Sequence, residues 1–231
     1  MNITVYLGAN LGTDPALPQA VQQLGRWIGE SGNALVYGGS KSGLMGLLAD
    51  SVLAAGGRVT GVEPKCFLDA ELQHEGLTEL IVTEDISARK TKMIELGDAF
   101  IAFPGGTGTL EEITEVISKL SLGQLNAPCI LYDLNGYYQP LHQLLQQMIT
   151  MGLSTPNARD CCTWLCAAVF FHKNGIPGRS QMTRYPEKNH SAGYAHSTRG
   201  GHLNLSAQSK RPLHKIMCNG LLLSCYVRCA R

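Results

Sequence analysis

Short apolar segments alternate with amphipathic segments throughout the first 154 residues of the chain. The apolar segments are bounded by glycine or polar residues, which is typical of buried strands. They predict strands at Ile3–Leu7, Ala34–Tyr37, Arg58–Val62, Glu79–Val82, Ala99–Phe103 and Cys129–Tyr132. Between them, apolar positions recur at helical spacing. This recurrence predicts helices at Leu17–Gly29, Leu44–Ala55, Ala88–Gly97, Thr109–Leu120 and Tyr138–Met151.

This alternation predicts an α/β fold, a doubly wound (Rossmann-like) parallel sheet with helices on both faces. Right-handed crossovers place the loops that follow the strands along one edge of such a sheet, where ligands bind. Two glycine-rich turns, at residues 38–46 and 104–109, each follow a predicted strand and open a predicted helix. We therefore expect both turns to meet at one ligand site.

Residues 155–231 have a different composition from the first part. Of the 18 acidic side chains, 16 lie in residues 1–154, together with 8 of the 19 lysines and arginines, although the whole chain carries a net charge of only +1. The later part holds six of the eight cysteines: Cys161, Cys162, Cys166, Cys218, Cys225 and Cys229. Helical and strand periodicity stops near Pro156, so no further strand is expected after it. We predict a Rossmann-like domain at 1–154 and an atypical, basic, Cys-rich C-terminal tail at 155–231, disordered or out of frame.

A metal-binding or nucleic-acid-binding role for the tail is the alternative interpretation. The cysteines do not form the paired C-x-x-C pattern of zinc sites, so no metal site is expected. The acidic first part argues against nucleic acid as its partner. The N-terminal segment reads as a strand without a basic region, and no apolar run is long enough for a membrane helix. With only Cys66 and Cys129 in the first part, we expect a cytoplasmic protein with no membrane partner.

The most informative stretch runs from Pro104 to Glu112. Its glycines, Gly105, Gly106 and Gly108, allow a close approach of the backbone to a ligand, and the first N–H groups of the next helix point at the same place. The positive end of the helix dipole favours a phosphate there. An ordinary helix cap by Thr107 or Thr109 is the simpler alternative, but it does not explain the three glycines. Glu111 and Glu112 add carboxylates to the same pocket.

Two further motifs surround this turn. The turn Gly38–Gly46 resembles part of a phosphate-binding P-loop, but Leu44 stands where the lysine would be, which disfavours a kinase or an ATPase. Arg89 and Lys90 lie at the start of a predicted helix, where the dipole disfavours cations. A nearby anion would explain that placement.

Together these motifs resemble the LOG (Lonely Guy) family of cytokinin-riboside 5′-monophosphate phosphoribohydrolases, long mislabelled lysine decarboxylases. The stretch Pro104–Glu112 matches the family's P-G-G-x-G-T-x-x-E motif, and Arg89-Lys90 matches its Arg-Lys pair. Gly38–Gly46 is similar to its G-G-G-x-x-G-L-M-G loop, with Ser40 in place of the third glycine. Gly61–Lys65 is similar to its G-V-I-P-K segment, with Glu63 in place of an apolar residue, and Gly136–Tyr138 to its D-G-Y-Y turn. The resemblance covers residues 1–154 and not the tail.

The resemblance implies a cofactor-free, metal-free hydrolase. It would cleave the N-glycosidic bond of a nucleoside 5′-monophosphate, such as AMP or N6-prenylated AMP, to free base and ribose 5-phosphate. Arg89 and Glu112 would be catalytic, and Met93 is a candidate wall of the base pocket. Substrate-binding positions would be Gly38, Gly39, Ser40, Gly43, Glu71, Lys90, Gly105, Gly106, Thr107, Gly108, Thr109, Glu111 and Ser118. In family members the residue at Glu71 reaches the neighbouring subunit's active site, which implies a homodimer with shared sites.

Two other functions remain open at this point. A non-catalytic carrier of a nucleotide or of the molybdenum cofactor could use the same fold, although it would not need both Arg89 and Glu112. A phosphotransferase is disfavoured by the missing P-loop lysine.

Overall fold

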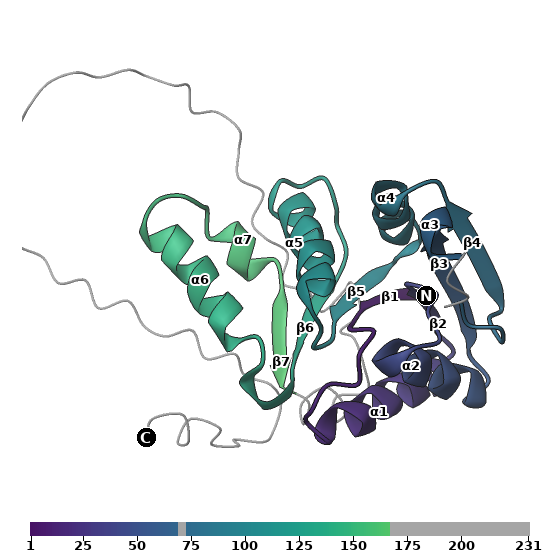
Figure 1. Cartoon of the computed structure of the whole chain (residues 1–231). Helices are drawn as coiled ribbons and strands as arrows, with labels where there is room; N and C mark the ends of the chain where they lie inside the picture. The colour runs from purple at the N-terminus through teal and green to yellow at the C-terminus, as the bar shows by residue number, and fades with distance from the viewer. Residues whose placement is uncertain (69–72, 167–231) are drawn as a thin grey trace, which may run out of the picture. The chain divides into compact units, whose positions relative to one another are not determined.

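Seven strands form one sheet in the order β4-β3-β2-β1-β5-β6-β7, and every neighbouring pair is parallel (Figure 1). The computed structural model describes residues 1–68 and 73–166, all within the unit Met1–Arg184. The strands are β1 (Asn2–Tyr6), β2 (Ala34–Tyr37), β3 (Arg58–Pro64), β4 (Glu79–Thr83), β5 (Ala99–Ala102), β6 (Cys129–Asp133) and β7 (Thr163–Cys166). The helices are α1 (Ala16–Glu30), α2 (Gly43–Ala54), α3 (Lys65–Leu68), α4 (Ile86–Leu96), α5 (Thr107–Ser121), the 3-10 turn η1 (Leu134–Gly136), α6 (Gln139–Thr150) and α7 (Asn157–Asp160).

Both faces of the central strands are buried, because their alternate side chains point into different cores. In β1, Ile3 and Val5 pack into the core under α1 and α2. Tyr6 packs into the core that α4 and α5 cover, where the Thr4 hydroxyl donates to the Met93 carbonyl of α4 at 3.0 Å. This arrangement explains why the strands read as short apolar runs. The predicted doubly wound fold is confirmed (Figure 1).

The order in which strands are added to the sheet reverses between β1 and β5. The chain builds outward from β1 to β4, then returns to pair β5 with the other side of β1, in a register that joins Tyr6 to Ala102. Loops after these two strands therefore diverge and leave a crevice at their carboxyl ends, which is the usual ligand position in open α/β sheets. The glycine-rich turn that begins at Pro104 follows β5 directly.

The fold continues past the predicted tail boundary. The expectation of no strand after Pro156 was wrong, because β7 pairs with β6 from Ile130–Thr163 to Asp133–Cys166. Without β7, one edge of β6 would keep a row of unpaired backbone groups. Four residues are too few to stand out from the basic, Cys-rich composition around them. Residues 167–231 lie outside the described part of the chain, so a separate tail stays a prediction.

The predicted helix at Ala88–Gly97 begins two residues earlier in the structure. Asp85 is its N-cap, and the Asp85 carboxylate accepts from the Ala88 N–H at 2.7 Å. Arg89 therefore lies one turn inside α4, where its backbone N–H already donates to the Asp85 carbonyl. The short elements α3 and η1 were not predicted, because a single turn carries no periodic signal.

Gly43 allows the loop after β2 to touch the loop after β1. Its φ is +56°, a left-handed conformation, and a Cβ at this position would lie 1.9 Å from the Ala9 carbonyl oxygen. The carbonyl oxygen belongs to the backbone and the position of a Cβ is set by the backbone, so no side-chain rotation relieves the clash. This contact keeps two of the crevice loops side by side.

We expect Gly43→Ala to destabilise the protein far more than Gly56→Ala. Gly56 also has a left-handed φ of +76°, but no atom of the described residues lies within 4 Å of a Cβ there. Its substitution therefore costs only the conformational strain, about 1 kcal/mol, whereas Gly43→Ala adds an overpacking cost of about 1–3 kcal/mol. Urea unfolding of both variants measures the difference. Equal losses would contradict the close approach of the two loops.

Candidate active site

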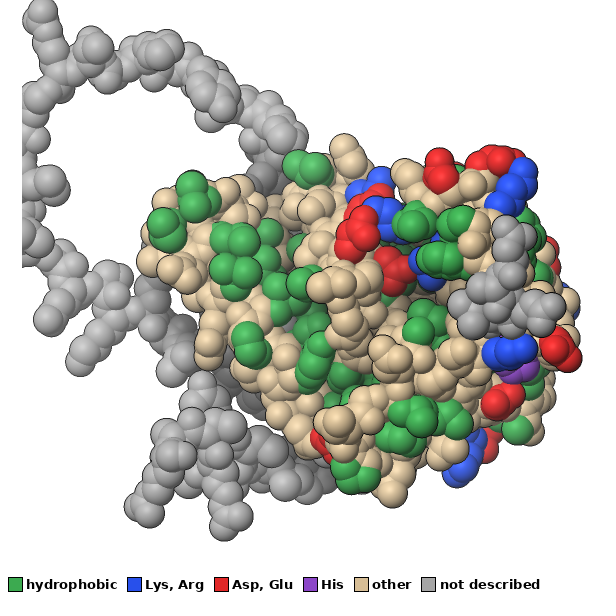
Figure 2. Space-filling view, in the orientation of Figure 1, with side chains coloured by type: hydrophobic (Ala, Val, Ile, Leu, Met, Phe, Trp, Pro, Cys, Tyr) green, Lys and Arg blue, Asp and Glu red, His purple; other side chains and the backbone are tan. Residues whose placement is uncertain are grey.

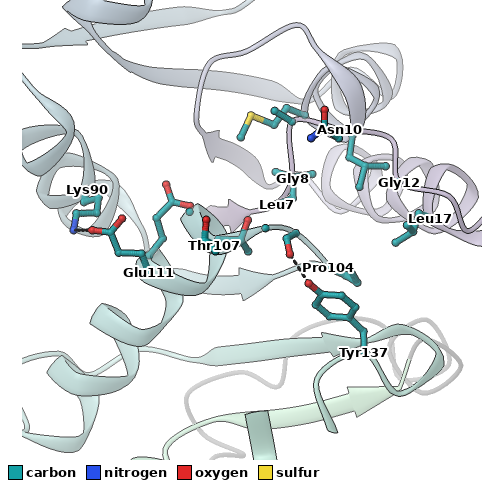
Figure 3. Close-up of a pocket in the computed structure, with 18 of the residues that line it drawn as sticks. Leu7, Gly8, Asn10, Gly12, Leu17, Lys90, Pro104, Thr107, Glu111 and Tyr137 are labelled. Atoms are coloured by element: carbon teal, nitrogen blue, oxygen red, sulfur yellow. Dashed lines mark hydrogen bonds and ion pairs between the residues drawn. The ribbon is translucent and has the colours of Figure 1, made fainter. Parts of the chain in front are cut away.

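A cleft of about 550 Å³ opens at the carboxyl edge of the sheet, where the loops after β1 and β5 diverge. Loop residues 7–12, the start of α2, the first turns of α4 and the glycine-rich turn before α5 line it (Figure 3). Nine of the predicted site residues lie along it: Arg89, Lys90, Gly105, Gly106, Thr107, Gly108, Thr109, Glu111 and Glu112. The structure thus brings together residues from two separate motifs.

Helix α5 presents an uncapped N-terminus to the cleft. Gly106 occupies the cap position, and among the described residues no side chain accepts from the first N–H groups of α5. The alternative in which Thr107 or Thr109 caps the helix is therefore wrong. Gly106, Thr107 and Gly108 all line the cleft, so backbone donors and the positive end of the helix dipole meet there. This is the donor set that suits a phosphate.

A buried ion pair joins α4 to α5 beside those donors. Arg89 Nη1 lies 3.0 Å from Glu112 Oε1, with side chains only 11% and 8% exposed. Arg89 Nε also donates to the Val62 carbonyl at 3.0 Å, so β3 fixes the guanidinium. Burial raises the pKa of Glu112, and the Arg89 charge opposes that rise. Because an arginine stays protonated, it favours the carboxylate form of Glu112.

A second, more exposed group of charged side chains lies next to this pair, nearer the solvent. Lys90 Nζ lies 2.7 Å from Glu111 Oε1 and 3.4 Å from Glu115 Oε2. The hydrogen bond to Glu111 raises the pKa of Lys90, so the ammonium form is held. Charged side chains of both signs gather between α4 and α5 in the space-filling view (Figure 2). The carboxylates of α5 supply the anions that offset two cations near the start of α4.

The first glycine-rich turn shapes the cleft from behind. Its predicted binding residues, Gly38, Gly39, Ser40 and Gly43, are absent from the lining formed by the described residues. A Cβ on Gly38 would lie 2.3 Å from Arg89 Nη2, so this glycine makes room for the catalytic candidate. The Ser40 hydroxyl accepts from the Ser42 N–H at 3.1 Å and belongs to the turn itself. Direct substrate contacts by these four residues stay predictions.

Two other predicted residues lie away from the cleft, and a third is outside the part of the chain that the structure describes. Ser118 lies exposed on α5, outside the lining of the cleft, and its substrate contact stays a prediction. Glu71 lies outside the described residues. Met93, expected as a wall of the base pocket, is instead 1% exposed and packs in the core between the sheet and α4.

The sequence alone missed several residues of the cleft. Asn10, Phe67, Ile86 and Tyr137 line it. Only Tyr137 belongs to a motif noted in the sequence, the Gly136–Tyr138 turn, and it was not predicted to bind substrate. The topology offers the missing signal for Asn10, because a loop after β1 must border the point where the strand order reverses. Tyr137 comes from the turn after β6, and its hydroxyl donates to the Gly105 carbonyl (Figure 3).

Within the described residues, no three His, Cys, Asp or Glu side chains are grouped closely enough to hold a metal ion. No helix in residues 1–68 and 73–166 is long and apolar enough to cross a membrane.

The fold and the cleft define a Rossmann-like α/β protein with an anion-suited site at the switch point of its sheet. The family model described as "Possible lysine decarboxylase" matches residues 45–169. A cytokinin riboside 5′-monophosphate phosphoribohydrolase of Rhodococcoides fascians is 46% identical over 160 residues, 69% of this chain and 81% of that protein. One from Arabidopsis thaliana is 40% identical over 157 residues, 68% of this chain and 72% of that protein. The chain belongs to this family, the LOG family.

Solved structures agree on the fold. The molybdenum cofactor binding protein of the phototrophic bacterium Rippkaea orientalis superposes with a TM-score of 0.54 at 23% identity, over 74% of this chain and 94% of that one. The molybdenum cofactor carrier protein of Chlamydomonas reinhardtii gives a TM-score of 0.53 at 21% identity, over 72% and 90%. At such identities the likeness shows the shared fold alone.

Glu63 is a buried carboxyl group behind the cleft. It is 1% exposed, and its Oε2 has no hydrogen-bond partner among the described residues. A Cβ on Gly39 would lie 3.4 Å from this oxygen, so the group packs under the first glycine-rich turn. Burial raises the pKa of Glu63, and the Arg89 charge opposes the rise. The ionised form is therefore costly in the folded protein.

We expect Glu63→Gln to be more stable than the wild type, by an amount that grows as the pH rises. The folded-state pKa of Glu63 lies above its unfolded value, so the wild-type contribution to stability is full at low pH and is lost as the pH rises through the folded pKa. Glutamine carries no charge and escapes that loss. Urea unfolding between about pH 5 and pH 8 measures it, with the exposed Glu79→Gln as the control. A pH-independent difference would contradict the buried charge.

Proposed function

We propose that this protein is a phosphoribohydrolase that cleaves the N-glycosidic bond of a cytokinin nucleoside 5′-monophosphate. AMP and N6-prenylated AMP are the candidate substrates, and the products are free base and ribose 5-phosphate. The observation that carries the proposal is the buried Arg89–Glu112 pair, 3.0 Å apart, beside the uncapped N-terminus of α5. The named activity of the relatives supports the same chemistry.

The phosphate end of the substrate binds at the glycine-rich turn. Gly106, Thr107 and Gly108 line the cleft at the uncapped start of α5, so their N–H groups are available to the phosphate oxygens. Gly105 and Thr109 shape this turn, since a Cβ on Gly105 would lie 2.2 Å from the Thr109 hydroxyl. Binding energy gained at this remote group orients the reacting bond.

The bond breaks next to the buried pair. Cleavage of the N-glycosidic bond develops positive charge on the ribose ring, and the Glu112 carboxylate stabilises that charge. The same carboxylate accepts a proton from the attacking water, whose oxygen joins the ribose carbon as the base leaves. Arg89 stabilises the negative charge that builds on the departing base, which takes up the proton released by Glu112 through solvent and leaves as the neutral free base. Glu111 and Lys90 stand at the mouth of the cleft, where ribose hydroxyls are within reach of a carboxylate.

The finer parts of the proposal come from the resemblance. Glu71 of one subunit completes the site of its partner in a homodimer, and Ser118 and the first glycine-rich turn contact the substrate. The protein acts in the cytoplasm, consistent with free thiols at Cys66 and Cys129. A carrier of the molybdenum cofactor shares the fold, but such a carrier does not need a buried carboxylate paired to an arginine.

We expect Glu112→Gln to lower base release by at least about 100-fold, because glutamine keeps the size of the side chain but cannot stabilise the ribose cation. Arg89→Ala should also abolish turnover, although it leaves a buried carboxylate unpaired and costs about 3 kcal/mol of stability. Chromatography of adenine and ribose 5-phosphate released from AMP and from isopentenyl-AMP measures turnover. Circular dichroism checks that each variant is folded.

The matched control is Glu95→Gln on the exposed surface of α4, where Glu95 pairs with Lys92 alone among the described residues, at 3.5 Å. It should keep wild-type turnover. Near-normal turnover in Glu112→Gln would overturn the catalytic assignment. Binding of AMP by the wild-type protein without release of adenine would favour the carrier function instead.

A mixing experiment tests the shared site. Glu71→Gln and Glu112→Gln homodimers should each be inactive, because every site lacks one carboxylate. A mixed dimer restores one intact site, with Glu112 from one subunit and Glu71 from the other. Random exchange should recover roughly a quarter of wild-type turnover, since about half of the dimers are mixed and each has one working site. No recovery after subunit exchange, with exchange verified by mass spectrometry, would contradict the shared site.

A further inference from the structure

Two adjacent tyrosines that follow β6, Tyr137 and Tyr138, are hydrogen-bonded to the backbone around the glycine-rich turn. The Tyr138 hydroxyl donates to the Phe103 carbonyl at 2.9 Å, and the Tyr137 hydroxyl donates to the Gly105 carbonyl. These two carbonyls flank Pro104. The rings pack edge to face with centroids 4.9 Å apart, so each holds the other in place. Neither tyrosine has a role in the reaction as derived above.

The turn that presents these tyrosines is itself firmly held. The Asp133 carboxylate accepts from the Tyr138 N–H at 2.7 Å and from the Gln139 side chain at 2.6 Å. Asn135 adopts a left-handed φ of 53°, and its side-chain amide donates to Asp14 at 2.9 Å. The segment that carries Tyr137 is therefore fixed by its own hydrogen bonds, independently of the glycine-rich turn.

The two hydrogen bonds act on peptide groups of different kinds. The Phe103 carbonyl belongs to the peptide of Pro104, which has no N–H to offer a ligand. The Gly105 carbonyl belongs to the peptide whose N–H is that of Gly106, the cap residue of α5 that lines the cleft. A donor on a carbonyl polarises the peptide and strengthens the N–H at its other end. Only the Tyr137 bond can therefore pass an effect on to a bound anion.

The Gly105–Gly106 peptide also needs to be held in orientation. With glycine on both sides, no Cβ opposes its rotation, and the reversed orientation would turn a carbonyl oxygen towards the ligand in place of an N–H. A hydrogen bond to the Gly105 oxygen stabilises the orientation that presents the N–H. Tyr137 lines the cleft and is about half exposed, so its hydroxyl acts at the rim of the site.

We propose that Tyr137 is a positioning residue for the phosphate group of the substrate, which it serves by orienting and polarising the Gly105–Gly106 peptide. The inference rests on the proposed function, because the anion is taken to be the 5′-phosphate. Tyr138 has the matching hydroxyl but only stabilises the turn. Removing one hydroxyl at a time from Tyr137 and Tyr138 therefore distinguishes an effect on phosphate binding from an effect on stability.

The test compares Tyr137→Phe with Tyr138→Phe in the full chain. Each variant removes one hydroxyl and keeps the ring. Titration calorimetry with inorganic phosphate and with ribose 5-phosphate should show about fivefold weaker binding for Tyr137→Phe, the factor expected for one neutral hydrogen bond. Adenine, which carries no phosphate, should bind Tyr137→Phe as it binds the wild type. Tyr138→Phe should bind all three as the wild type does but melt at a lower temperature.

Turnover gives a second readout that a structural defect would not imitate. For AMP, Tyr137→Phe should raise KM about fivefold and leave kcat nearly unchanged. Unchanged phosphate binding in Tyr137→Phe would overturn the inference, as would an equal loss in Tyr138→Phe or no phosphate binding by the wild type. If the wild-type protein binds ribose 5-phosphate but releases no base from AMP, the proposed function is wrong. The comparison of Tyr137→Phe with Tyr138→Phe would still decide whether Tyr137 positions the phosphate site.

Discussion

The buried ion pair between Arg89 and Glu112 is the interaction around which the cleft is organised. Two charges that are almost wholly removed from water are stable only when each satisfies the other and the remaining donors find partners. Arg89 directs one donor to Glu112 and a second to the Val62 carbonyl. The pair therefore ties α4 and α5 to β3, on either side of the place where the strand order reverses.

The glycines around the cleft are needed because neighbouring groups lie too close to leave room for a side chain. A guanidinium that lies over the turn after β2 requires Gly38, because a Cβ there would fall 2.3 Å from Arg89 Nη2. The approach of Gly43 to the Ala9 carbonyl closes the other side of the crevice. Glycine in these loops thus provides space for neighbouring groups, whereas glycine in the turn before α5 exposes N–H groups to the cleft.

Charge in the site is arranged by depth. Glu112 is buried, which raises its pKa against the opposing charge of Arg89, while Glu111 and Glu115 share Lys90 nearer the solvent. The cations and carboxylates of α4 and α5 largely offset one another. Backbone donors at the start of α5 then become the main attraction for an anion. That division suits a substrate with a phosphate at one end and a developing cation at the other.

The sequence by itself determined the strands, the long helices and the glycine-rich turn at Pro104, because these depend on local periodicity and on conformations that glycine favours. The family resemblance also grouped Arg89 with Glu112. Only the tertiary structure showed that Arg89 and Glu112 are in contact and that the Tyr137 hydroxyl binds the Gly105 carbonyl. It also showed that Glu63 and Met93 are buried and that β7 joins the sheet. These features depend on which segments meet in space. Residues 23 apart in the Arg89–Glu112 pair and 32 apart in the Tyr137–Gly105 bond leave no periodic trace along the chain.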